Sequence, residues 1–103
     1  MLRRLFQRKA RQPIPLLLYG RSECPLCDEM KEALERTPVG EPWELSEIDI
    51  DGDPALEDAY GRSIPVLFIG GRLAFKGRLG AAEFQKKFAR LARAWREGGE
   101  PCP

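Results

Sequence analysis

Apolar residues near the start of the chain form one short run that ends at a glycine. Leu16, Leu17 and Leu18 follow one another without alternation, after two prolines and before Gly20. A strand that is buried on both faces has this pattern, as in the centre of an α/β sheet. We therefore predict a buried strand over residues 16–20.

The next segment, residues 24–36, repeats its apolar positions at the spacing of an amphipathic helix. The expected inner face of this helix consists of Leu26, Met30, Ala33 and Leu34. A loop rich in proline and glycine follows, which predicts that the helix ends there.

Residues 43–50 predict a second strand, half-buried because Ile48 and Ile50 alternate with acidic residues. After a turn, Asp53 followed by Pro54 is typical of a helix N-cap with proline at the first helical position. We predict a short helix over residues 54–60, ended by a glycine.

Two more apolar runs, residues 65–69 and 72–76, are separated by Gly70-Gly71, which predicts an antiparallel hairpin. A final helix is expected over residues 81–96. Its apolar stripe consists of Phe84, Phe88, Leu91, Ala92 and Trp95.

The expected order of elements is therefore β-α-β-α-β-β-α. This order predicts an α/β fold, a four-stranded mixed sheet flanked by three helices. The two early βαβ connections predict parallel strand pairs with right-handed crossovers, and the hairpin adds an antiparallel edge.

The composition narrows the class of protein. With 103 residues, 43% apolar and 32% charged, the chain fits one domain with one core. No apolar stretch approaches the ~20 residues that span a bilayer. The formal net charge of +1 indicates no nucleic-acid partner. We expect a domain that binds neither membrane nor nucleic acid.

The two ends differ from the middle. Residues 1–12 form a basic N-terminal arm without acidic side chains, and they lack the apolar region of a secretory signal. Residues 98–103 form a C-terminal tail with Cys102, which we expect to be incidental to function. Three cysteines are too few for a secreted disulfide framework, so we expect a cytoplasmic protein.

The candidate chemistry lies at the first strand-to-helix junction, in Cys24-Pro25-Leu26-Cys27. Two cysteines at this spacing can cycle between dithiol and disulfide. A helix N-terminus favours the negative charge of a reactive Cys24 thiolate, and Pro25 suits the first turn because its missing N–H is not needed there. We assign the attack on a disulfide to Cys24 and the resolving step to Cys27.

The sequence contains no histidine, which excludes histidine acid–base catalysis and histidine metal ligands. Two alternatives to a redox pair stay open: an ordinary pair of buried thiols, or half of a zinc site. A zinc site needs two more ligands. Because Cys102 is the one remaining cysteine and histidine is absent, these ligands would include carboxylates.

Several motifs resemble those of glutaredoxins, in the same order and at similar spacings, over about residues 14–95. They are Leu18-Tyr19-Gly20-Arg21, Cys24-Pro25-Leu26-Cys27, Ile48-Asp49-Ile50-Asp51, Ser63-Ile64-Pro65 and Gly70-Gly71. The chain is most similar to short prokaryotic glutaredoxin-like proteins. The resemblance implies a thioredoxin-like fold, with a glutaredoxin-like domain over residues 13–97.

The resemblance also implies a substrate-binding surface. In the family, the proline matching Pro65 is cis and lies against the redox pair, and the backbone of the residue matching Ile64 pairs with the substrate. Gly77 matches a glycine of the family segment that holds glutathione, but the acidic residue of that segment is absent here. Asp28 and Glu29 stand where basic residues are usual, so the chain is less suited to anionic glutathione.

Arg21 and Arg62 are the candidates for contacts with the carboxylates of glutathione, and Pro25 completes the expected substrate-binding set. The implied function is that of a monomeric dithiol-disulfide oxidoreductase that reduces protein disulfides or glutathione mixed disulfides. We expect no tightly bound cofactor, and glutathione or a donor of the thioredoxin-reductase type as the source of electrons.

Two other functions stay open at this point. Some glutaredoxins carry an iron–sulfur cluster between two subunits, with glutathione, and this chain is a candidate for such a carrier. A module that uses the redox fold only for interaction, with residues 1–12 as its contact, is the other.

Overall fold

The computed structural model describes residues 12–98. The predicted roles of the basic arm, the tail and Cys102 therefore lie outside the described residues, apart from the ends of those segments. The elements are β1 (Ile14–Gly20), α2 (Pro25–Arg36), β2 (Trp43–Asp49), α3 (Pro54–Tyr60), β3 (Val66–Ile69), β4 (Arg72–Lys76) and α4 (Ala81–Arg96). Their order is the predicted one, and their bounds differ from the predicted bounds by at most two residues.

The four strands form one mixed sheet in the order β2-β1-β3-β4. β1 pairs with β2 in parallel, with Ile14 opposite Trp43. β1 and β3 are antiparallel, and so are β3 and β4. The predicted fold class, a four-stranded mixed sheet flanked by three helices, is confirmed.

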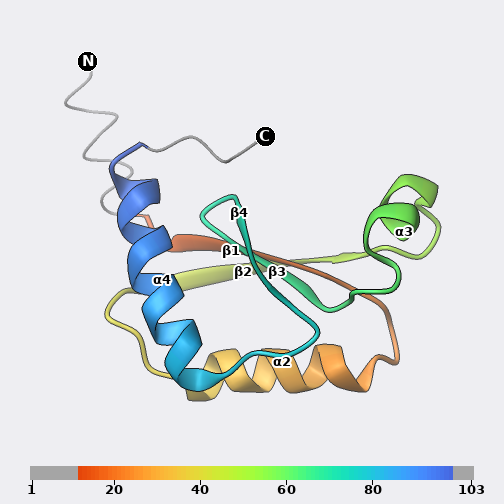
Figure 1. Ribbon diagram of the computed structural model, residues 1–103, viewed down its shortest axis with the longest axis horizontal. Coiled ribbons are helices and arrows are strands. Elements are labelled where there is room, and N and C mark those ends of the chain that lie inside the picture. The colour runs from red at the N-terminus through yellow and green to blue at the C-terminus, as the bar shows by residue number, and fades with distance from the viewer. Residues whose placement is uncertain (1–11, 99–103) are drawn as a thin grey trace.

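The predicted parallel pairing across the second βαβ connection is wrong. β3 runs antiparallel to its neighbour β1, and therefore opposite to β2. α3 has seven residues with none buried, and it lies at one end of the sheet rather than along a face (Figure 1). The chain therefore turns at that end, and β3 starts near where β2 stops.

The core lies between one face of the sheet and the helices α2 and α4, which lie on the same side of the sheet (Figure 1). Period-two alternation directs Ile14, Leu16 and Leu18 of β1 to this face, and all three are buried. The helices contribute Met30, Leu34, Phe84, Phe88, Leu91 and Ala92. Burial of these side chains fixes both helices against the sheet and holds the start of α2 near the end of β1.

Two predicted core positions are exposed. Leu26 is 36% exposed, and Cys27 takes the buried place on the first turn of α2. Ile48 is 39% exposed, because β2 is an edge strand and Ile48 is on the face away from α2 and α4. Ile50, just past β2, is fully buried as predicted.

The second face of the sheet is covered differently. Leu17, Tyr19 and Phe68 lie on it and are only partly buried. Tyr60 at the end of α3 stacks on Tyr19, with ring centroids 4.9 Å apart. The predicted burial of β1 on both faces is therefore complete on the helix side and partial on this one.

The β3–β4 turn follows the predicted chemistry. Gly70 and Gly71 have φ values of +58° and +83°, the left-handed conformation at both central positions of a tight hairpin. A Cβ on Gly70 would lie 3.0 Å from the Cβ of Trp95 in α4. Glycine at this position therefore allows both the turn and the close packing of α4.

Candidate active site

Cys24 is the N-cap of α2. Its Sγ accepts a hydrogen bond of 3.2 Å from the backbone N–H of Cys27, and its carbonyl accepts one from the N–H of Asp28 at 3.1 Å. Pro25 occupies the first helical position, as predicted. The sulfur of Cys24 thus sits where unpaired N–H groups and the helix dipole favour a negative charge.

Cys24 and Cys27 form a disulfide, with their Cα atoms 5.2 Å apart. The two residues differ in access to solvent. Cys24 is partly exposed, whereas Cys27 is 4% exposed and faces the core side of α2. Of the two, Cys24 is therefore the more accessible to a large disulfide substrate. Its role as the attacking cysteine stays a prediction.

Gly20 at the end of β1 provides the space for Cys27. A Cβ built on Gly20 would lie 2.9 Å from Sγ of Cys27, closer than side chains normally approach. The absence of a side chain at this strand end therefore lets the redox helix pack directly on the backbone of β1.

Replacing Gly20 by alanine tests this contact. Because the added methyl group overlaps Sγ of Cys27, we expect Gly20→Ala to destabilise the oxidised protein by ~1–3 kcal/mol. Gly40→Ala is the matched control, because nothing lies within 4 Å of a Cβ there, and it should change stability by less than ~0.5 kcal/mol or raise it slightly. Urea unfolding measures both; equal midpoints for the two variants would contradict the contact.

The turn before Cys24 is held by polar contacts to the segment after β2. Nε of Arg21 donates to Asp51 at 2.6 Å, and another guanidinium nitrogen donates to the carbonyl of Gly61 at 3.2 Å. Arg21 thus connects the redox turn to the ends of β2 and α3. Its contact with glutathione stays a prediction.

Ser22 and Asp49 add a second connection. Oγ of Ser22 donates to Asp49 at 3.1 Å, and the N–H of Asp51 donates to the other carboxylate oxygen at 2.8 Å. The backbone hydrogen bond from Asp51, followed by the side-chain hydrogen bond from Ser22, lowers the pKa of Asp49 from its ordinary 3.8. Asp49 is therefore an anion at neutral pH, directly beside the redox turn.

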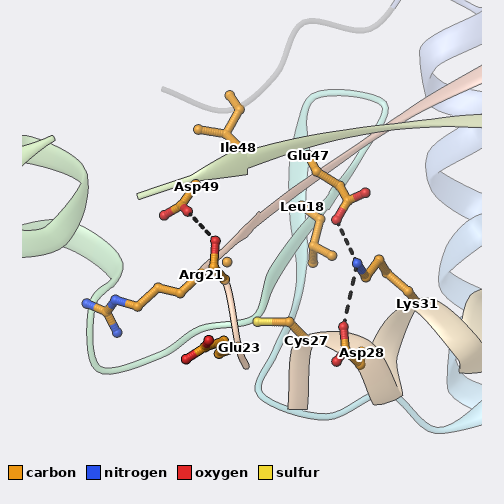
Figure 2. A pocket seen from close by; sticks show the side chains of 11 residues that line it. Leu18, Arg21, Glu23, Cys27, Asp28, Lys31, Glu47, Ile48 and Asp49 are labelled. Carbon is orange, nitrogen blue, oxygen red and sulfur yellow. Dashed lines mark hydrogen bonds and ion pairs between the residues drawn. The ribbon is translucent and has the colours of Figure 1, made fainter. Parts of the chain in front are cut away.

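A cavity of about 370 Å³ lies beside Cys27, between α2 and the end of β2 (Figure 2). Nζ of Lys31 bridges Glu47 at 2.9 Å and Asp28 at 3.6 Å on one wall, and Arg21 and Asp49 lie on the other (Figure 2). The hydrogen bond with Glu47 is the largest cause that raises the pKa of Lys31 from 10.5. Water in this cavity would meet a charged, mainly acidic wall close to Cys27.

Sequence reasoning did not identify Lys31 and Glu47. The sequence signal that could have identified Glu47 is the alternation in β2, because Trp43, Leu45 and Glu47 share the face that α2 covers. Glu47 is opposite Leu18 of β1, on the face that α2 covers, and there its carboxylate pairs with Lys31 of α2.

The segment directly before β3 contains the predicted cis proline. The Ile64–Pro65 peptide bond is cis, as the resemblance implied, and Pro65 is fully buried. The carbonyl of Pro65 accepts a hydrogen bond of 2.7 Å from the N–H of Gly77, whose φ is +78°. Pro65 and Gly77 are thus brought together, whereas Arg62 is exposed in the α3–β3 connection. The substrate-binding roles of Ile64, Pro65, Gly77 and Arg62 stay predictions.

Residues 15–89 match the family described as Glutaredoxin-like domain (DUF836). The chain belongs to this glutaredoxin-like family. The matched segment contains Cys24, Cys27, the cis proline and Gly77, and it ends within α4.

Two solved structures resemble the glutaredoxin-like domain. An X-ray structure of protein XcR50 from X. campestris has a TM-score of 0.62 and 36% identity, over 73% of this chain and 96% of that chain. The solution NMR structure of protein Ne2328 from Nitrosomonas europaea has a TM-score of 0.60 and 29% identity, over 74% and 92%. The family match and these structures agree with a thioredoxin-like α/β fold.

Two further properties of the glutaredoxin-like domain concern residues 12–98. Within this range no helix is long and apolar enough to cross a membrane. In the same range, His, Cys, Asp and Glu side chains do not gather in groups of three or more that could hold a metal ion.

Proposed function

We propose that this glutaredoxin-like domain is a dithiol-disulfide oxidoreductase. The observation that carries the proposal is the position of Cys24 at the N-cap of α2, where its sulfur accepts the Cys27 N–H while Cys27 is buried beneath it. The more accessible cysteine is the one whose sulfur accepts a backbone N–H, a contact that favours its negative charge, and the buried cysteine is within disulfide distance of it.

The reaction starts from the reduced pair. The thiolate of Cys24 attacks one sulfur of the substrate disulfide, the substrate S–S bond breaks, and one substrate thiolate leaves and takes a proton from water. Cys27 then loses its proton and attacks Sγ of Cys24. The mixed disulfide breaks, and the second substrate thiolate leaves. Two electrons pass to the substrate, and the Cys24–Cys27 disulfide is formed.

The cavity beside Cys27 supports the second step. Cys27 is buried, so its proton needs a route to solvent. The cavity lined by Cys27, Lys31, Glu47 and Asp49 provides that route, since it opens on one side to water and on the other to the thiol. This arrangement needs no histidine.

Protein disulfides and glutathione mixed disulfides are the proposed substrates, and glutathione or a donor of the thioredoxin-reductase type supplies the electrons. Arg62 is the more available cation for a glutathione carboxylate, because Arg21 already pairs with Asp51 and Gly61. We propose no tightly bound cofactor.

Turnover with two electron sources tests the proposal. NADPH consumption is followed with hydroxyethyl disulfide and insulin as substrates, once with glutathione and glutathione reductase and once with thioredoxin reductase. We expect the protein to accelerate at least one combination well above the rate without it. If the fully reduced, folded protein reduces neither disulfide, even when supplied in stoichiometric amount, the proposed activity is wrong.

A further inference from the structure

A small groove lies between α2 and the segment that joins β4 to α4. It has a volume of about 150 Å³. Its lining consists of Leu26, Glu29, Met30 and Ala33 from α2, and Gly77, Arg78 and Leu79 from the loop. The groove is separate from the charged cavity beside Cys27, and neither Cys24 nor Cys27 is among its lining residues.

The groove begins at the redox motif itself. Leu26 stands between the two cysteines on the first turn of α2, and it is 36% exposed. Gly77, on the opposite wall, is hydrogen-bonded to the carbonyl of the cis proline Pro65. When a substrate protein is disulfide-bonded to Cys24, the residue next to the substrate cysteine is therefore within reach of the groove.

The chemistry of the lining selects the kind of group that fits. Met30 is 2% exposed, Ala33 and Leu79 are partly buried, and Leu79 also packs against the core. An apolar cavity of about 150 Å³ is large enough to bind a benzene-sized group. Single exposed leucines are common, but Leu26 here lines the groove together with Met30, Ala33 and Leu79. Glu29 and Arg78 add polar surface to the same lining.

The charges at the groove favour neither sign of charge in an occupant. Glu29 and Arg78 carry opposite signs, so they give no net preference for an anion or a cation. The γ-glutamyl end of glutathione carries both an ammonium and a carboxylate, and burying either against aliphatic side chains costs free energy unless hydrogen bonds replace its water. A neutral apolar side chain has no such cost.

We propose that this groove binds an apolar side chain next to the reactive cysteine of a protein disulfide, so that the domain prefers such substrates to glutathione mixed disulfides. The inference rests on the proposed function, and the electrons move as described there. Leu26, Ala33 and Leu79 are then specificity-determining residues, which contact the substrate but not its sulfurs.

The test uses single turnover, so that no electron donor is needed. Prereduced protein is mixed with short neutral peptides whose one cysteine is disulfide-bonded to 2-mercaptoethanol. One series has leucine directly before or directly after the cysteine, and the reference series has serine at the same positions. Acid quenching and chromatography give the second-order rate constant for each peptide. Glutathione bonded to 2-mercaptoethanol is a further substrate.

We expect leucine, at one of the two positions, to raise the rate constant about tenfold over serine, since an apolar group in a fitted pocket discriminates by that order. The glutathione disulfide should react like the serine peptides. In Leu26→Ser the leucine-to-serine ratio should fall towards one. Ala33→Leu, which fills the groove without making it polar, should lower the ratio as well. Leu73→Ser, at another exposed apolar position, should keep it.

Three outcomes would overturn the inference, and they are distinguishable. If the protein reduces all peptides at one rate, the groove has no role and the oxidoreductase activity stands. If it reduces none of them, the activity fails and the inference fails with it. An unchanged ratio in both Leu26→Ser and Ala33→Leu, measured on folded variants, would place the preference elsewhere on the surface.

Discussion

Replacing Cys24 by serine is expected to abolish disulfide reduction, a loss of at least about a thousandfold, or about 4 kcal/mol in the transition state. The hydroxyl of serine is not ionised at neutral pH, so the N–H of Cys27 and the dipole of α2 have no thiolate to stabilise. The same turnover assays measure the loss.

Cys27→Ser is the matched variant, because it removes only the buried sulfur. We expect it to form the mixed disulfide with the substrate through Cys24 and then stop when the substrate is a protein disulfide. Mass spectrometry under non-reducing conditions should show a stable adduct with Cys27→Ser and none at residue 24 with Cys24→Ser. Full activity of folded Cys24→Ser would contradict the dithiol mechanism. An adduct that forms through Cys27 in Cys24→Ser would instead reverse the assignment of the two roles.

Replacing Phe84 by alanine should lower the free energy of unfolding by about 3–5 kcal/mol. Phe84 is fully buried, and its ring contacts Phe88 and Phe75 with centroid distances of 5.6 and 6.4 Å. A domain of this size has a total stability of about 5–15 kcal/mol, so the change removes a large part of it. Urea unfolding monitored by circular dichroism measures the loss.

Leu73→Ala is the control for Phe84→Ala. Leu73 is 46% exposed on β4, so its truncation should change stability by less than about 0.5 kcal/mol. If Phe84→Ala does not fold, Phe84→Leu should still unfold at clearly lower urea than the parent. Equal midpoints for Phe84→Leu, Leu73→Ala and the parent would contradict the position of α4 in the core.

The residues of α2 show how much of the site can be predicted from the sequence alone. The spacing predicted the helix, its proline at the first position and an N-terminal Cys24, all of which depend on neighbours in the chain. It also placed Leu26 in the core, but the structure buries Cys27 there. Both positions fit an apolar stripe of similar width. The choice between them depends on Gly20 of β1, whose missing side chain admits the sulfur of Cys27.

The direction of β3 shows a similar limit. An α/β alternation favoured a second parallel pair, and nothing within residues 54–60 marks the helix as one that fails to cross the sheet. The result depends on where α3 packs: Tyr60 stacks on Tyr19 at one end of β1, so the helix does not return the chain along the face. A prediction from periodicity has no access to this contact.

The sequence by itself determined the local elements and the position of the redox pair, because caps, turns and hydrophobic periodicity act between residues that are close in the chain. Resemblance added the cis Ile64–Pro65 bond, which the structure contains. Only the tertiary structure decided which cysteine is buried, that Arg21 is already paired with Asp51 and Gly61, and that Lys31 and Glu47 line a cavity beside Cys27. It also brought Leu26 and Leu79 together in the lining of one groove. Each of these features joins segments distant in the sequence, and the packing of α2 against the sheet and the loops sets their distances.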